Sequence, residues 1–413
     1  MRIEVSEKGA LPPGWRWVRV GDVIRDAQSG FASGERDAGG VVQLRMNNVT
    51  SSGRFDWSAL TRVPADAAVI ETFGLEPDDV LFNNTNSVEL VGKSALFGGF
   101  EEPVVFSNHF TRIRTDDTEL VPEFLAAWLQ QRWNSGLFAR ICHRWVGQAA
   151  VQRERLLDLQ MALPDVPQQK RIAAALREQT AVVERARAAA EAQLEAASAL
   201  PVAYILSAFE ESKTRAWPTG PLADVCTLLP SRSIASDGDT VVQTITTACL
   251  SETGFRPEGV KTARMWAESA TDCVVRRGEV LVARSNTPEL VGRACLFDGS
   301  PPSVVASDLT IRVEAGTKMY APFLAAFLSF LYVTGYWRAK SGGASGSMKK
   351  ITRSQLENQA IPVPELDDQR RVSEELSGAL STAERIQRTV DAQLQTIAAM
   401  KGALLRRAFS GDL

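Results

Sequence analysis

The sequence repeats itself at a constant offset of 200 residues, and this duplication limits the possible folds more than any other feature. ELVGKSALFGG at Glu89–Gly99 matches ELVGRACLFDG at Glu289–Gly299, and VVQ at Val41–Gln43 recurs at Val241–Gln243. Later in each copy, AQL at Ala192–Leu194 recurs at the same offset. The period is too long and the copy number too low for a solenoid of short repeats. We therefore predict two related halves.

Each half begins with a stretch of mixed character and ends with a helical one. Short apolar runs after turn residues, such as Asp79–Phe82, indicate strands, and Val121–Arg132 indicates a helix. The predicted fold class is α+β, with two tandem, pseudo-symmetric globular domains, each followed by a long helix. The predicted boundaries are 1–165 and 214–365 for the globular domains, and 166–213 and 366–413 for the helical segments.

The two helical segments carry apolar residues at alternating steps of three and four, which keeps one seam facing a partner helix. This spacing favours a mutual coiled coil over two independent core helices. Pro201 predicts an end or a kink in the first helix. The predicted seam consists of Ile172, Leu176, Val183 and Leu194 in the first segment and Leu376, Ile386, Val390, Leu394 and Ile397 in the second.

The composition excludes several classes of protein. The five cysteines form no CxxC pair, and the two histidines, His109 and His143, lie in no known metal motif. The residues after the initiator methionine do not resemble a signal peptide, and no apolar run approaches the roughly 20 residues of a membrane span. We therefore expect a cytoplasmic protein without a membrane partner. The formal net charge of −3 means that any case for nucleic-acid binding must rest on local features.

Several segments together resemble the specificity subunit of type I restriction–modification systems. LPPGWRWVRVGDV at Leu11–Val23 is similar to the opening motif of that family, and GEVLVARSNTPELVG at Gly278–Gly292 is similar to its strand–turn segment. GSMKKITRSQLENQAIPVPELDDQ and its first-copy counterpart resemble the segment that leads into each helix, and LLRRAFSGDL resembles the family's C-terminal motif. Two segments depart from the pattern. WPTGPLADV, at the start of the second copy, matches the opening motif only in part, and GQAAV in the first copy lacks a serine.

The resemblance implies a function without catalysis. Each globular domain would be a target-recognition domain that reads one half of a split, asymmetric site in double-stranded DNA. The helices would pack as an antiparallel coiled coil that spaces the two readers. Two modification subunits, which resemble adenine-N6 methyltransferases and hold S-adenosylmethionine, would dock on the chain, and a restriction/translocase subunit would join them. The chain itself would need no cofactor and no metal.

Although the net charge of the chain is negative, two local stretches are strongly basic, as contact with DNA phosphates requires. Arg338–Arg353 carries five cations and no acid, and Arg132–Arg155 carries five arginines against Glu154 alone. Glycine and serine residues in the former let backbone N–H groups approach phosphates. The alternative is that both stretches are solvated surface loops. The predicted phosphate contacts are Arg140, Arg144, Arg153, Lys340, Lys349, Lys350 and Arg353.

We expect the residues that read bases to lie where the two copies differ between motifs that they share, because two different half-sites need different side chains. Asn pairs with adenine edges and Arg with guanine edges in the major groove. The alternative is that the Asn and Ser side chains only make turn hydrogen bonds. The predicted readers are Arg45, Asn47, Asn48, Asn83 and Asn84 in the first copy and Thr246, Thr247, Arg284 and Ser285 in the second.

Two other classes of function stay open at this point. VGKSAL at Val91–Leu96 lacks the earlier glycine of a P-loop, and neither a GxGxxG nor an NPPY-like motif occurs, but an enzyme with unfamiliar motifs is the chief rival. The other rival is a structural protein whose helices bind a partner while its globular domains read nothing. Neither of these two functions explains why the same motifs occur in both copies while the loop residues between them differ.

Overall fold

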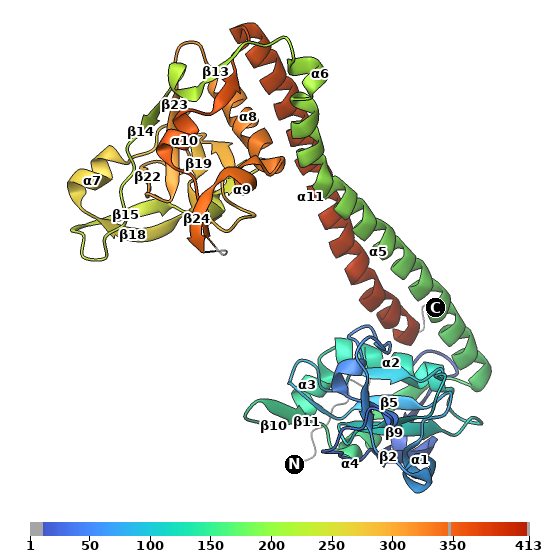
Figure 1. The fold of residues 1–413 in the computed structure, drawn as a ribbon. Coiled ribbons are helices and arrows are strands. Elements are labelled where there is room, and N and C mark those ends of the chain that lie inside the picture. Colours follow the sequence, from blue (N-terminus) through green and yellow to red (C-terminus); the bar gives the residue numbers. More distant parts are fainter. Residues whose placement is uncertain (1–10, 346–347, 411–413) are drawn as a thin grey trace. The chain divides into compact units, whose positions relative to one another are not determined.

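The computed structural model describes residues 11–345 and 348–410, and it divides into two compact units (Figure 1). Unit 1 comprises residues 1–189 and 394–413, and unit 2 comprises residues 190–393. Both units mix helices and strands. Residues 346–347 of the second basic stretch and residues 411–413 of the C-terminal motif lie outside the described residues.

Unit 1 is built on an antiparallel sheet with strand order β2-β9-β5-β7. A second sheet has the order β4-β3-β8, with β3 and β8 parallel, and a separate ribbon pairs β1 with β12. The bounds of these strands are β1 Arg16–Arg19, β2 Ile24–Ser29, β3 Val41–Leu44, β4 Thr61–Val63, β5 Val80–Asn83, β7 Ser94–Leu96, β8 Val104–Phe106, β9 Phe110–Thr115 and β12 Gln160–Leu163.

The main helix of unit 1 is α2 (Pro122–Asn134), which corresponds to the helix predicted at Val121–Arg132. Proline at its first position is tolerated because that N–H has no helical partner. Its buried face, with Phe124 and Trp128, packs on the main sheet in the larger core of the unit. The shorter helices are α1 Ala67–Phe73, α3 Leu137–Ile141, α4 Arg153–Leu157 and the 3₁₀ turns η1 Val20–Asp22 and η2 Met46–Asn48.

Unit 2 has the same strand orders as unit 1. Its main sheet runs β14-β23-β19-β21, its second sheet runs β18-β15-β22, and β13 pairs with β26. The bounds are β13 Thr219–Pro221, β14 Cys226–Leu229, β15 Thr240–Ile245, β16 Leu250–Ser251, β17 Gly254–Phe255, β18 Lys261–Met265, β19 Val280–Ala283, β21 Ala294–Leu296, β22 Val304–Ala306, β23 Thr310–Ala315 and β26 Ala360–Pro362. The helices are α6 Glu211–Thr214, α7 Ala267–Asp272, α8 Ala321–Val333, α9 Tyr336–Lys340, α10 Arg353–Glu357 and the 3₁₀ turns η3 Leu222–Asp224, η4 Thr247–Cys249 and η5 Pro257–Gly259.

Two long helices follow the sheets: α5 (Val166–Ala208, 43 residues) and α11 (Leu366–Ser410, 45 residues). A fully buried glutamine fixes the start of each helix. The Oε1 atom of Gln169 accepts from the backbone N of Val121 at 2.8 Å, and the Oε1 atom of Gln369 accepts from the N of Tyr320 at 2.8 Å. Since both side chains satisfy buried backbone groups that would otherwise be unpaired, they tie each helix to the sheet domain before it.

Within each unit, α5 and α11 contact each other in antiparallel order. In unit 1, Glu184 lies 3.9 Å from the Nζ atom of Lys401, while Ile172 and Leu405, further along each helix in opposite directions, share one core. In unit 2, the Nε2 atom of Gln387 donates to the carbonyl of Ala197 at 3.0 Å, while Phe209 and Val372 share one core.

The predicted seam is only partly the buried seam. Ile172, Leu176, Leu376 and Val390 are buried, and Val183, Leu194, Leu394 and Ile397 are half-buried. Ile386 is 38% exposed, however, and its neighbour Gln387 faces α5 instead, so the assignment of Ile386 was wrong. One residue along a helix is a rotation of about 100°, and the apolar pattern alone favoured the isoleucine over the polar side chain.

Pro201 does not end α5, which continues to Ala208. The Pro201 ring is buried and the helix on either side of it is retained. Of the predicted end or kink, the end was wrong, because proline removes only one helical hydrogen bond and the helix continues beyond it.

Candidate nucleic-acid interface

In unit 1, a small antiparallel sheet brings the first basic stretch beside the turn that carries Asn83 and Asn84. The strands β10 (His143–Trp145) and β11 (Gln148–Ala150) form a hairpin, and β11 pairs with β6 (Thr85–Asn86). The tip of this hairpin is open to solvent, with Trp145 56% exposed. An exposed aromatic side chain among cations can contact sugars and bases as well as phosphates.

Unit 2 contains the same arrangement. The strands β24 (Gly342–Ser345) and β25 (Met348–Lys350) pair, and β25 also pairs with β20 (Ser285–Asn286), with Lys350 opposite Ser285. Two stretches that were predicted separately, one for phosphates and one for bases, are therefore neighbours in both units.

The turn beside this sheet in unit 1 is held by its own amide side chains. Asn83 is fully buried, and its Nδ2 atom donates to the carbonyls of Thr85 at 3.1 Å and His109 at 2.9 Å. Its Oδ1 atom accepts from Asn86 at 2.6 Å. Because this side chain has no surface and its polar atoms are occupied, we correct its assignment from base readout to a structural role.

The next position holds a different residue in each copy, Asn84 in the first and Arg284 in the second. Asn84 is half-buried, and its Nδ2 atom donates to the Asn108 carbonyl at 3.2 Å. Its counterpart Arg284 is also half-buried, and its Nη1 atom donates to the Asp308 carbonyl at 3.2 Å. The Nε atom of Arg284 is buried without a hydrogen-bond partner. A guanidinium has five N–H donors, more than this one contact uses.

Of the two asparagines predicted to read bases in the loop after β3, one is buried and the other is exposed. Asn48 is 2% exposed; its Oδ1 atom accepts from the backbone N of Arg45 at 2.9 Å, and its Nδ2 atom donates to the carbonyls of Asp56 and Ala59. Asn48 is therefore a cap of η2 and is reassigned from base readout to that role. Asn47, in contrast, is exposed.

A buried cation supports the same loop. The Nζ atom of Lys93 donates to the carbonyl of Met46 at 3.3 Å and to the carbonyl of Val49. Burial lowers the pKa of Lys93. Sequence reasoning missed this residue; its signal was a cation at the same repeat position in both copies, Lys93 and Arg293.

Arg45 is half-buried directly after β3. Its Nη2 atom donates to the Oε1 atom of Gln43 at 3.2 Å, and burial, followed by the charge of Arg36, lowers the pKa of Arg45. Burial and then the charge of Arg45 lower the pKa of His109, whose carbonyl accepts from the backbone N of Asn84 at 3.0 Å. Arg45 thus influences the charge of His109, and the backbone of His109 holds Asn84 in place.

The counterparts of this loop in unit 2 are threonines. The Oγ1 atom of Thr246 donates to the Gly259 carbonyl at 2.8 Å and accepts from the backbone N of Ala248 at 3.2 Å, as a cap of η4. Thr247 and Ser285 are half-buried. Arg45 and Thr246 occupy the same structural position, directly before η2 and η4, so a long cation in unit 1 is replaced by a short hydroxyl in unit 2.

Most of the predicted phosphate contacts lie at the surface. Arg140, Arg144, Arg153, Lys340 and Lys350 are exposed, and Lys349 is half-buried. Arg353 differs, because its guanidinium donates to the carbonyls of Leu228 at 2.7 Å and Leu229 at 2.9 Å. These bonds anchor α10 to β14, so we correct the assignment of Arg353 from a phosphate contact to a structural residue.

Among the described residues, no group of three or more His, Cys, Asp or Glu side chains is placed to hold a metal ion. None of the helices in the described part of the chain is both long and apolar enough to cross a membrane.

The fold is that of type I specificity subunits. A chain from the structure described as "Structural basis underlying complex assembly and conformational transition of the type I R-M system" matches with a TM-score of 0.72 and 20% identity, over 98% of this chain and 99% of that one. The crystal structure of the HsdS subunit from Thermoanaerobacter tengcongensis matches with a TM-score of 0.63 and 20% identity, over the same shares of the two chains.

The sequence is also similar to a curated protein, "Putative type I restriction enzyme MjaX specificity subunit" of Methanocaldococcus jannaschii. The identity is 26% over 170 residues, which cover 41% of this chain and 40% of that relative. No family model matches the sequence. The resemblance predicted from the sequence motifs is thus confirmed by this relative and by the fold of the two solved structures.

Proposed function

We propose that this chain is the DNA-recognising specificity subunit of a type I restriction–modification complex and has no catalytic activity of its own. Residues 1–165 and 214–365 are the two target-recognition domains. Each reads one half of a split, asymmetric site. The proposal includes two docked modification subunits, which supply adenine-N6 methylation with S-adenosylmethionine, and a restriction/translocase subunit.

One observation carries the proposal. In both units, a hairpin sheet with exposed cations lies beside a turn whose side chains differ between the copies. Phosphate contacts position a protein on DNA without specifying sequence, and base contacts specify it. A repeated frame with changed turn residues therefore provides two readers of different sequence on one chain.

The long helices supply the separation between the readers. We propose that α5 and α11 form an antiparallel coiled coil and act as a spacer. A helix of 43 residues is about 65 Å long at 1.5 Å per residue. At about 3.4 Å per base pair, this length exceeds one turn of DNA. The spacing of the half-sites is then a property of helix length.

The test is to express the chain with its modification subunit and to map N6-methyladenine across the genome by long-read sequencing. The expected result is one motif with two specified parts and a fixed gap. A contiguous motif, or methylation that does not depend on this chain, would contradict the proposal. Methyl transfer by the isolated chain would instead support the enzyme alternative.

Residue-level readout is tested by two matched substitutions. Arg284→Ala is expected to relax the half-site read by unit 2 and to leave the other half-site intact, because a bidentate arginine–guanine contact contributes about 1–3 kcal/mol of discrimination. Arg45→Ala should have the converse effect. If both variants kept the wild-type motif, these two residues would not be the readers.

A further inference from the structure

Pro201 lies inside α5, seven positions from its last residue Ala208. A proline in a helix has no N–H to donate to the carbonyl four residues earlier, and its ring crowds that carbonyl. The carbonyl affected here is that of Ala197. Because Ala197 is only 3% exposed, water has little access to the oxygen that Pro201 leaves without its helical donor.

The missing donor comes from the other long helix. The Nε2 atom of Gln387, on α11, donates to the Ala197 carbonyl at 3.0 Å. Ala383 and Val390, on the same face of α11, are buried, so Gln387 is a polar residue within an apolar seam. The interaction lies entirely within unit 2.

The surrounding seam does little to select an alignment of the two helices. Around Gln387 the buried residues of α5 include Ala190 and Ala197, which are small, and small side chains fit several alignments equally well; the large Ile205 is buried two turns beyond Ala197. A single polar residue in a coiled-coil seam specifies register because a shift leaves its partner unpaired. A slip of one turn moves a helix by about 5.4 Å, which exceeds the rise of one base pair.

We propose that Gln387 is a positioning residue that keeps α5 continuous across Pro201 and fixes the register of α11 against α5. Gln387 thereby sets the gap between the two DNA half-sites; this last step rests on the proposed function. The corresponding positions in the other copy hold Arg187 and Lys401 in place of Gln387 and Pro201, so the repeat itself does not require the pair.

A double-mutant cycle on the full chain tests the pairing. Gln387→Met removes the donor and preserves side-chain length, and Pro201→Ala restores the backbone N–H that can bond to the Ala197 carbonyl. We expect Gln387→Met to speed hydrogen exchange of the α5 amides after Ala197 about ten-fold, which equals about 1.4 kcal/mol. In the Pro201→Ala background the same substitution should change exchange by less than about three-fold. Gln393→Met, at an exposed position of α11, is the matched control and should have no effect.

The same variants, assembled with the modification subunit, give the second readout. Gln387→Met should increase methylation at sites whose gap is one base pair longer or shorter about ten-fold relative to the correct gap, whereas the control Gln393→Met should leave the gap unchanged. An equal effect of Gln387→Met in both backgrounds would overturn the proposal, as would unchanged exchange in the single variant. A wild-type chain that yields no gapped motif would overturn the proposed function, while the exchange cycle would still decide whether the pairing exists.

Discussion

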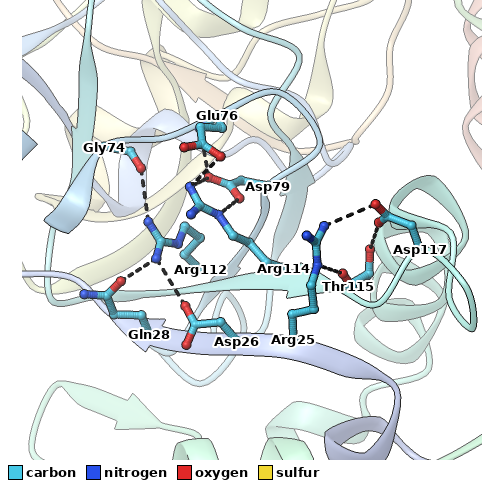
Figure 2. A network of polar contacts seen from close by, with 10 residues as sticks. All are labelled: Arg25, Asp26, Gln28, Gly74, Glu76, Asp79, Arg112, Arg114, Thr115 and Asp117. Carbon is cyan, nitrogen blue, oxygen red and sulfur yellow. Dashed lines mark hydrogen bonds and ion pairs between the residues drawn. The ribbon is translucent and has the colours of Figure 1, made fainter. Parts of the chain in front are cut away.

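The two units build the same main sheet, but they neutralise its buried arginine in different ways. In unit 1, Arg112 donates to the half-exposed Asp26 and to Gln28 (Figure 2). The buried Asp79 forms an ion pair with Arg114 instead, at 2.7 Å. In unit 2, the counterpart Arg312 pairs directly with the buried Glu279 at 2.8 Å, and both side chains are 3% exposed.

Two paired substitutions explain the difference. Strand pairing places Val80 opposite Ile113, so residue 79 lies opposite residue 114. In the same way Val280 pairs with Val313, so residue 279 lies opposite residue 314. In unit 1 that pair is Asp79 with Arg114, whereas in unit 2 both positions hold glutamates. Glu279, one methylene longer, reaches the diagonal neighbour Arg312 instead. The two copies thus keep a buried arginine at the same position of the main sheet, while the acidic residue that pairs with it differs.

The largest expected difference between the units comes from removing this cation. Arg312→Met should lower the free energy of unfolding of unit 2 by about 3–5 kcal/mol, because the buried Glu279 would lose its cation and keep only the backbone N–H of Arg276 as a donor. Arg112→Met should cost unit 1 about 1–3 kcal/mol, since Asp26 is accessible to water. Denaturant unfolding, with hydrogen exchange in β5 and β19 to separate the units, measures both. Equal costs would show that burial of the carboxylate does not decide the difference.

The second comparison concerns the arginines that begin α4 and α10. Arg353→Ala should destabilise unit 2 by about 1.5–3 kcal/mol, because two carbonyls of β14 lose a charged donor. Arg153→Ala should cost less, about 0.5–1 kcal/mol, because that side chain is exposed and makes one longer bond to the main sheet, from Nη1 to the Ala27 carbonyl at 3.3 Å.

Arg153→Ala should act on DNA binding instead. It should reduce the slope of log K against log salt by about 0.9, the value for one lost phosphate contact. Titrations of the complex with the modification subunit at several salt concentrations measure the slope. A lost phosphate contact for Arg353→Ala and a larger stability loss for Arg153→Ala would reverse the assignment.

The third comparison uses the buried cation under the η2 loop. Lys93→Met should lower the free energy of unfolding by about 1–2 kcal/mol at neutral pH, because the carbonyls of Met46 and Val49 lose their donor. Burial lowers the pKa of Lys93 in the folded chain below its ordinary value of 10.5. Between the two pKa values the unfolded chain binds more protons, so the wild type should gain stability as the pH rises toward 10.5.

Unfolding at a series of pH values tests this sign. The gain should be absent from Lys93→Met. A difference between wild type and variant that stays constant with pH would contradict it.

The smallest expected effect is at the junction of the two long helices in unit 1. Glu184 lies 2.7 Å from Arg54 and 3.9 Å from Lys401, and the hydrogen bond from Arg54 is the main cause of its lowered pKa. Glu184→Gln should cost about 0.5–1 kcal/mol above pH 4.5, the ordinary value, and nothing well below the lowered pKa, where the wild-type carboxyl is also neutral.

The matched control is Glu384→Gln in unit 2. The positions that correspond to Arg54 and Lys401 hold Gly254 and Pro201 there, so this substitution should have a smaller effect. High salt should reduce the cost of Glu184→Gln and leave that of Glu384→Gln unchanged. The same pH and salt dependence for both variants would show that the cations are not responsible.

Much of the candidate interface could be predicted from repeat alignment. The exposed cations and the variable turns were found as separate stretches, and pairing of β11 with β6 and of β25 with β20 places them together. The inward orientation of Asn48 and Asn83 could not be predicted, because an asparagine that caps a loop and one that reads a base have the same local sequence. The acceptors that decide between these roles, such as the His109 carbonyl, are distant in the sequence.

By itself, the sequence determined that the chain has two copies of one design and two long helices, because a constant offset and a heptad spacing are properties of residue order alone. Only the tertiary structure decided that Gln387 rather than Ile386 faces α5, and that Arg353 serves the fold rather than the surface. Both outcomes depend on backbone carbonyls that packing removes from water, and a sequence pattern of apolar and polar residues does not record which carbonyls those are.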